Sequence, residues 1–168
     1  MKTLFRTRLR SALALACLLA GLPAAAQTLL LVVQENANAR PLPPPFAVRE
    51  GISGDLFDAG YVVLDAPGSS PLPAAAELAH IAQSAGADIV LEVATDYSDT
   101  LLGMDMLRIS ARTTYSLIDS TTSAIIAHGT REATNKDRER DVSRSVLGGE
   151  IGKDVAAQAG IALRALRP

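Results

Sequence analysis

Apolar positions follow two different periods along the chain, and the change of period divides it into two halves. In the first half, short apolar runs rich in branched residues alternate with segments of helical spacing. The runs are residues 29–33 (LLLVV), 61–65 (YVVLD) and 88–94 (DIVLEVA). Continuous apolar runs of this length are typical of strands that are buried on both faces of a sheet. We therefore predict that residues 29–33 form a strand buried on both faces and that the other two runs form a second and a third strand.

The segments between these runs have the periodicity of amphipathic helices. Residues 46–59 predict a helix that ends at Gly60, where a left-handed C-cap glycine is expected. Residues 74–85 predict a second helix that ends at Gly86. The proline-rich residues 36–45 predict a loop, because proline removes backbone donors. A β-α-β-α-β order with right-handed crossovers makes the three strands parallel.

Strict alternation of apolar and polar side chains starts the second half. Residues 107–118 alternate in this way, which predicts a long strand with one buried face and one wet face. Residues 119–123 predict a turn, because short oxygen-bearing side chains bond their own backbone. Residues 124–131 predict its antiparallel partner, and residues 150–166 a final helix. The expected fold class is α/β on the border with α+β: a single mixed sheet, β-α-β-α-β, then an antiparallel hairpin and a C-terminal helix.

The first 26 residues have the pattern of an export signal. Four basic residues precede an almost wholly apolar run, residues 11–22, and small residues follow it. This pattern predicts a cleavable signal peptide that is cut between Ala26 and Gln27, so that residues 27–168 form a single domain in the periplasm. One alternative is an uncleaved membrane anchor, but the apolar run is shorter than the about 20 residues of a spanning helix. No membrane span is expected after cleavage.

Cys17, the only cysteine, lies inside the apolar run. Lipoprotein anchoring at Cys17 is the alternative to cleavage after Ala26. The preceding residues, Ala14 to Ala16, do not place a leucine three positions before the cysteine, as the usual lipobox does. Cleavage after Ala26 would leave no thiol, which excludes disulfides and thiolate chemistry in the mature chain.

The charge balance narrows the classes of ligand. Without the leader, 12 basic residues face 18 acidic ones. This excess of acid argues against nucleic acid or an anionic membrane surface as the main ligand. Residues 136–144 mix both signs and are expected to be a solvated segment. Tryptophan is absent and other aromatic residues are few, which argues against a platform that stacks bases.

Three carboxylates surround the expected link between the third and fourth strands, residues 95–104. They are Asp96, Asp99 and Asp105, and together they could chelate a cation such as calcium. Their spacing does not match an EF-hand loop, and a solvated acidic loop is the alternative. No cofactor is expected.

The other candidate groups form no complete catalytic set. Glu77 and His80 lie one helical turn apart, but a di-iron site needs a second such pair. A serine-histidine-aspartate relay would need His80 or His128, and no G-x-S-x-G elbow presents its nucleophile, since residues 51–54 lie within an expected helix. Residues 148–152 match no phosphate-binding motif and predict helix initiation after a flexible hinge.

Several segments resemble a known group of bacterial envelope proteins. The layout over residues 29–166 is similar to the small mixed α/β module of CsgG-related proteins, of the penicillin-binding-protein activator LpoB and of the amino-terminal domain of TolB. The resemblance rests on residues 56–65, 85–91, 115–119 and 125–127. It implies an accessory, partner-binding role in the envelope. The link over residues 95–104 is too short for the membrane hairpins of a CsgG-like pore.

The expected function is that of a periplasmic accessory or protein-binding module whose partner is another envelope protein. Two alternatives remain open. One is a small periplasmic hydrolase that uses His128 or His80. The other is a small-ligand carrier, which a closed apolar pocket of several hundred cubic ångström would favour.

Overall fold

The computed structural model describes residues 27–44, 46–66, 71–103, 106–135 and 144–166. Cys17, Ala26 and residues 136–143 lie outside these ranges. The described elements are β1 (Thr28–Ala37), β2 (Arg40–Pro41), α2 (Ala47–Asp58), β3 (Val62–Asp65), α3 (Ala75–Ala85), β4 (Ile89–Gly103), β5 (Met106–Asp119), β6 (Ile125–Thr134) and α4 (Arg144–Ala165). Among them, no helix is both long enough and apolar enough to cross a membrane.

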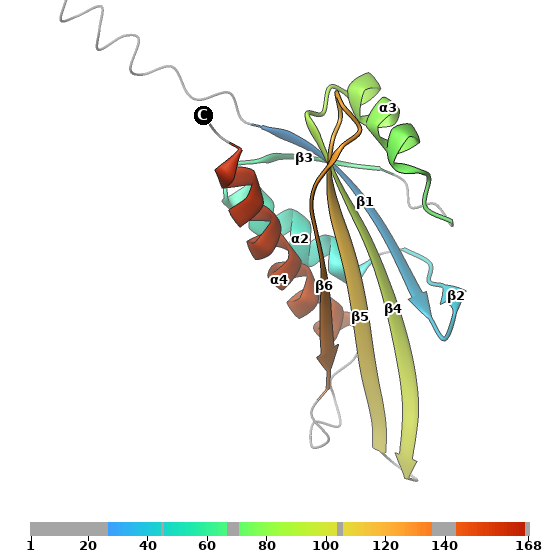
Figure 1. Cartoon of the computed structure of the whole chain (residues 1–168). Coiled ribbons are helices and arrows are strands. Elements are labelled where there is room, and N and C mark those ends of the chain that lie inside the picture. The colour runs from blue at the N-terminus through green and yellow to red at the C-terminus, as the bar shows by residue number, and fades with distance from the viewer. Residues whose placement is uncertain (1–26, 45, 67–70, 104–105, 136–143, 167–168) are drawn as a thin grey trace, which may run out of the picture.

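One mixed sheet organises these elements (Figure 1). Its strands follow the order β2-β1-β4-β5-β6, and β3 pairs with the first residues of β1, whereas β2 pairs with the last ones. β1 runs parallel to β3 and β4, while the β4–β5 and β5–β6 pairs are antiparallel. Leu29 lies opposite Ile89 and Leu31 opposite Leu91, so the first and third predicted strands are neighbours in one sheet. The predicted fold class is confirmed.

The helices cover the two faces of the sheet unequally. α2 and α4 lie side by side on one face, and α3 covers only one end of the other (Figure 1). Because side chains alternate along a strand, the LLLVV run of β1 supplies both faces. The core under α2 and α4 includes Leu31, Val33, Ile52, Leu91 and Val155. The smaller core under α3 includes Leu30, Val32, Leu78, Val90 and Ile118.

Glycines bring α2 and α4 into backbone contact. A Cβ atom added at Gly51 would lie 2.4 Å from the carbonyl oxygen of Gly149, and one at Gly152 would lie 2.4 Å from that of Val48. The prediction of a hinge and a helix start in residues 148–152 is therefore wrong. α4 begins at Arg144, and its glycines form the surface on which α2 packs.

Two predicted loops are partly strand. β4 continues to Gly103, where we predicted a link over residues 95–104, and β1 continues to Ala37 and is followed by β2. The physical reason is pairing: the polar second half of β4 hydrogen-bonds with β5 along its length, from Thr95 opposite Thr113 to Leu101 opposite Leu107. A polar segment with a full ladder partner needs no apolar run to be a strand.

The predicted turn over residues 119–123 is confirmed. Oδ1 of Asp119 accepts hydrogen bonds from the backbone N–H of Thr122 at 2.7 Å, from that of Thr121 at 2.9 Å and from the hydroxyl of Thr122 at 3.0 Å. The bonds from Thr122 are the main reason why the pKa of Asp119 lies below its usual value. This side chain therefore closes the β5–β6 hairpin.

Candidate docking arm and its anchor

β4 and β5 extend beyond the rest of the sheet (Figure 1). The last β1–β4 pair is Ala37 with Tyr97, and the last β5–β6 pair is Ser110 with Thr134. Beyond these pairs, residues 99–103 and 106–109 pair as strands with each other and with no other strand that the structure describes. We call these two segments the arm. Leu101 in the arm exposes 79% of its surface, although it is a large apolar residue.

An asparagine stands on each side of the base of the arm, where the neighbouring strand ends. The N–H of Asn38 donates to the carbonyl oxygen of Tyr97 at 2.9 Å, and its Oδ1 accepts from the N–H of Asp99 at 3.3 Å. The N–H of Asn135 donates to the carbonyl oxygen of Ile109 at 3.0 Å, and its Oδ1 accepts from the N–H of Ile109 at 2.7 Å. The two asparagines thus continue the ladder in place of β1 and β6.

An ion pair joins the arm to the first residue of α4. The guanidinium of Arg144 donates to both carboxylate oxygens of Asp99, with Nε 3.3 Å from Oδ1 and Nη2 bonded to Oδ2. This hydrogen bonding raises the pKa of Arg144, so the cation is retained. A bidentate contact fixes the direction of both side chains, and it therefore orients the base of the arm against α4.

A buried carboxylate lies next to this ion pair. Glu35 is only 3% exposed. Its Oε1 accepts from the backbone N–H of Val48 at 2.8 Å, and its Oε2 accepts from the hydroxyl of Tyr97 at 3.1 Å. Phe46, the N-cap residue of α2, makes no side-chain capping bond, so Glu35 from β1 satisfies a helix N-terminus that would otherwise be uncapped.

Burial is the main cause of the pKa shifts of both Glu35 and Tyr97. Desolvation raises the pKa of Glu35, and the bonds from Val48 and Tyr97 offset only part of this shift. Burial and the nearby Glu35 carboxylate raise the pKa of Tyr97 well above its usual value, so this hydroxyl remains a donor. Packing is tight here: a Cβ atom at Gly148 would lie 2.4 Å from the Tyr97 hydroxyl oxygen.

A groove of about 310 Å³ opens beside Glu35 and Arg144. Its lining is Glu35, Leu42, Ala47, Glu50, Arg144 and Ser145. The groove lies near the carboxyl end of β1, beside the first residues of α2 and α4. Four of its six lining residues are polar or charged and the groove is open to solvent, so it does not match the closed apolar pocket that a small-ligand carrier would require.

The structure does not bring together Asp96 and Asp99 of the predicted carboxylate cluster. Asp96 and Asp99 are three residues apart on one strand, and an odd spacing places them on opposite faces. Asp96 accepts a hydrogen bond from Asn36 at 2.8 Å on the open face, while Asp99 binds Arg144 on the helix side. Asp105 lies outside the described residues. Within those residues, no three acidic, histidine or cysteine side chains are placed to hold a metal ion.

The histidines lie apart on different elements. Glu77 and His80 are exposed on α3, and His128 is exposed on β6. His128 lies opposite Ser116, which in turn lies opposite Glu92. A serine-histidine-carboxylate relay needs the histidine between the other two groups, but here the serine is in the middle. This row therefore lacks the order that a hydrolytic relay requires.

We call Glu35, Tyr97, Asp99 and Arg144 together the anchor of the arm. Sequence reasoning missed most of these residues. It named Asp99 as a possible cation ligand, and it gave no role to Glu35, Tyr97 or Arg144. The available signal was a glutamate two residues after the buried run 29–33, at a position that alternation assigns to the same face as Leu31 and Val33. A charged residue on a buried face must find partners, and this signal could have identified Glu35.

Replacing Asp99 with alanine should loosen the base of the arm without unfolding the domain. We expect a loss of about 1–2 kcal/mol in unfolding free energy. The change removes the charge-assisted bond from Arg144 to the Asp99 side chain, which is only 16% exposed. Hydrogen exchange of the arm amides should accelerate. Arg112→Ala is the matched control. Its ion pair with Glu132 is about 70% exposed, at 68% and 71%, and should contribute below about 0.5 kcal/mol. Equal effects of the two variants would contradict an anchoring role.

No protein-family model and no curated protein sequence matches the chain. Solved structures match its fold. The PelC dodecamer from Paraburkholderia phytofirmans has a TM-score of 0.57 and 19% identity, covering 79% of this chain and 88% of that chain. The hypothetical protein CT253 from Chlamydia trachomatis has a TM-score of 0.55 and 12% identity, covering 83% of this chain and 99% of that one.

Lipoprotein GNA1162 from Neisseria meningitidis matches with a TM-score of 0.51 and 17% identity, covering 80% of this chain and 99% of that chain. The carboxy-terminal domain of LpoB from Salmonella enterica, from the group that the sequence resembles, reaches a TM-score of only 0.46, with 19% identity over 70% of this chain and 90% of that one. At these identities the likeness is one of fold alone. The chain has a fold that is also found in a bacterial lipoprotein.

Proposed function

We propose that the chain is an exported accessory module of the bacterial envelope that binds another protein through the arm. The anchored arm is the observation that carries this proposal. A two-stranded ribbon is marginally stable by itself. Here Asn38, Asn135 and the Asp99–Arg144 pair hold its base in a fixed direction. Such reinforcement of a projecting segment is expected where the segment must meet a partner in one orientation.

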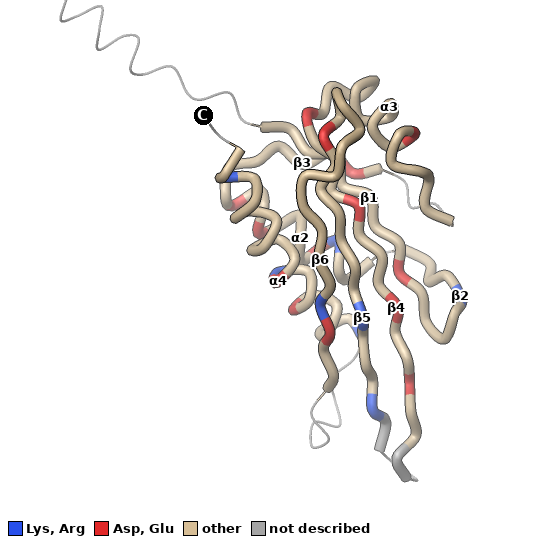
Figure 2. Tube along the Cα trace, viewed as in Figure 1, with Lys and Arg blue, Asp and Glu red and all other residues tan. Residues whose placement is uncertain are grey.

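The surface of the arm suggests the chemistry of that partner. Leu101 is almost fully exposed, and an exposed leucine on a projecting ribbon is suited to entering an apolar pocket. Figure 2 shows basic positions along β5 beside acidic positions on β4. Next to the arm, Asp96 on β4 lies opposite Arg112 on β5. A partner with an apolar pocket bordered by both signs of charge would match this surface.

Two other observations support the proposal. The signal pattern of residues 1–26 predicts export, with cleavage after Ala26 and release of residues 27–168 into the periplasm. PelC, which has this fold, assembles as a dodecamer, so the fold is compatible with an assembly role. Under this proposal no cofactor is needed, because the module acts by docking.

Site-specific cross-linking tests the proposal. A photoreactive amino acid in place of Leu101 should yield one reproducible adduct in the envelope of the native host, and the same probe at Glu77 on α3 should not. The Leu101→Asp variant should compete with the wild-type chain for this adduct at least about tenfold less well, as for a contact at the centre of an interface. Absence of an adduct specific to position 101 in repeated experiments would rule out docking through the arm.

A further inference from the structure

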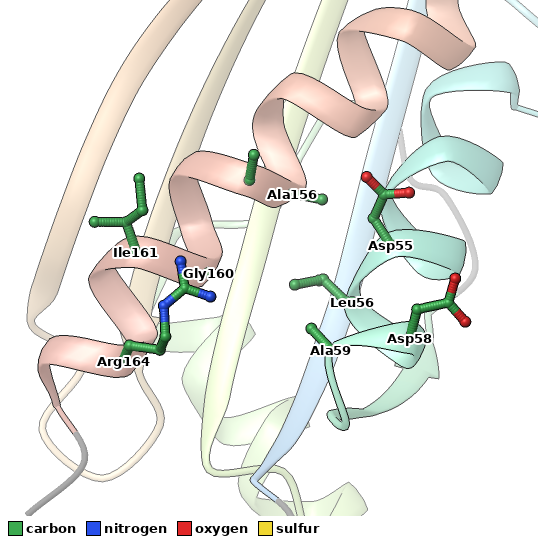
Figure 3. A pocket seen from close by; sticks show the side chains of 9 residues that line it. Asp55, Leu56, Asp58, Ala59, Ala156, Gly160, Ile161 and Arg164 are labelled. Atoms are coloured by element: carbon green, nitrogen blue, oxygen red, sulfur yellow. The ribbon is translucent and has the colours of Figure 1, made fainter.

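A second groove, of about 340 Å³, lies between α2 and α4 near their C-terminal ends (Figure 3). Leu56, Ala156 and Gly160 are buried at its floor. Asp55 and Asp58 line it from α2, and Ile161 and Arg164 line it from α4. The groove therefore has a small apolar floor. Its α2 side is acidic, and its α4 side carries one apolar and one basic side chain.

The α4 side of the groove has features that internal packing does not explain. Ile161 exposes 56% of its surface at the edge of the groove. At Gly160, an added Cβ atom would meet only Nη1 of Arg164, at 3.8 Å. Glycine inside a helix costs about 1 kcal/mol relative to alanine, yet nothing among the residues that the structure describes requires it here. The missing side chain at Gly160 leaves room beside the exposed Ile161. The isoleucine of a second, identical groove would fit into this space.

The positions of the charges indicate how a second copy would align. α2 and α4 run parallel, with Ala47 beside Gly148, so a rise of 1.5 Å per residue brings Ala59 level with Gly160. The guanidinium of Arg164 is also near Gly160, which places it near the level of Asp58. Within the described chain, no ion pair joins Arg164 to Asp58 or Asp55.

We propose that this groove is a homotypic interface, in which a two-fold axis along the groove relates two copies of the chain. Such an axis places α2 of one copy on α4 of the other, so that Asp58 faces the partner copy's cation at position 164 and Ile161 enters the opposite groove. An axis across the groove would instead place α2 on α2, and aspartate would face aspartate. Opposite charges favour the first arrangement and like charges oppose the second.

This interface leaves the arm accessible. The groove lies towards the C-terminal ends of α2 and α4, whereas the arm projects from the other end of the sheet (Figure 1). A dimer formed through the groove would present two arms. The inference goes beyond the docking function proposed above, and it does not depend on it.

Charge reversal tests the interface in the chain purified in its processed form from the native host. Sedimentation velocity should show a dimer for the wild type. Asp58→Arg and Arg164→Asp should each weaken self-association at least about tenfold, because each places like charges together at both ends of the two-fold contact. An equimolar mixture of the two variants should recover the dimer, since each variant then faces the charge that it lacks.

The controls separate this interface from others. Glu77→Arg, on α3 across the sheet, should leave the sedimenting mass unchanged. If the wild type forms a larger assembly, the single variants should halve its mass and the mixture should restore it. The proposal is overturned by a wild type that remains monomeric up to high concentration. It is also overturned by folded single variants that keep the wild-type mass, or by a mixture that does not recover it.

Discussion

Replacing Gly51 with alanine should destabilise the protein by about 1–3 kcal/mol, although alanine is the better helix former by about 1 kcal/mol. The new Cβ atom would lie 2.4 Å from the carbonyl oxygen of Gly149 and 3.2 Å from Cα of Gly152. These are backbone atoms of α4 and cannot rotate away as a side chain could. The two helices would have to separate, and the core beneath them would lose contacts.

Gly54 provides the matched control in the same helix. It is exposed, and a Cβ atom there would meet nothing within 4 Å. Gly54→Ala should therefore stabilise the protein by about 0.5–1 kcal/mol through helix propensity. Urea unfolding measures both variants, and an unchanged m-value would show that only stability has changed. Opposite signs for two changes one turn apart are the expected result. The same sign for both would mean that the backbone contact does not limit the approach of the helices.

The first half of the sheet could be predicted from the sequence mainly because β1 is buried on both faces, whereas β3, with Val62 44% exposed, was recognised by its short apolar run alone. The LLLVV run has few other structural interpretations, and the αL glycines at Gly60 and Gly86 mark the helix ends. The second half of β4 was missed because its outward face is polar and its inward face carries Thr95, Tyr97 and Asp99. Such a segment becomes a strand because it pairs with a neighbouring strand, and the local sequence does not show which segment that neighbour is.

The start of α4 was missed for a related reason. Gly148, Gly149 and Gly152 have low helix propensity, and their local composition favours a loop. Packing on α2 overrides that preference, because the close approach of the helices needs the absence of side chains at Gly148 and Gly152. The sequence contained the glycines, but it did not show which other helix they face.

The candidate site could be predicted only in part. Asp96 and Asp99 were grouped because they are close in sequence, and recognising them as residues of one strand would have separated them by parity alone. The anchor brings together Glu35, Tyr97 and Arg144, which lie on β1, β4 and α4. The bond from Tyr97 to Glu35 spans 62 residues of sequence, and the bond from Arg144 to Asp99, two residues beyond Tyr97 on β4, spans 45, so no local pattern contains them.

Glu35 should be the residue at which a single truncation has the largest effect. Glu35→Ala would leave the N–H of Val48 and the hydroxyl of Tyr97 buried without their acceptor, and we expect a loss of about 2–4 kcal/mol in unfolding free energy. Glu35→Gln has the same shape and keeps an oxygen for Val48, and its amide can donate to the tyrosine oxygen. This variant should retain most of the stability near neutral pH, which separates hydrogen bonding from charge.

The pH dependence then identifies which form of Glu35 the fold prefers. Burial raises its native pKa above the unfolded value of 4.5; Arg49 lowers it and Glu50 raises it by smaller amounts. The native state therefore binds the proton more tightly than the unfolded state. The stabilisation from this group is complete below pH 4.5 and is lost as the pH rises through the native pKa. Urea unfolding of the wild type and Glu35→Gln between pH 4 and 8 should show the wild type losing stability relative to the variant over this interval. A difference that grows in favour of the wild type as the pH rises would mean that the bonds from Val48 and Tyr97 outweigh desolvation, and that the carboxylate is the preferred form.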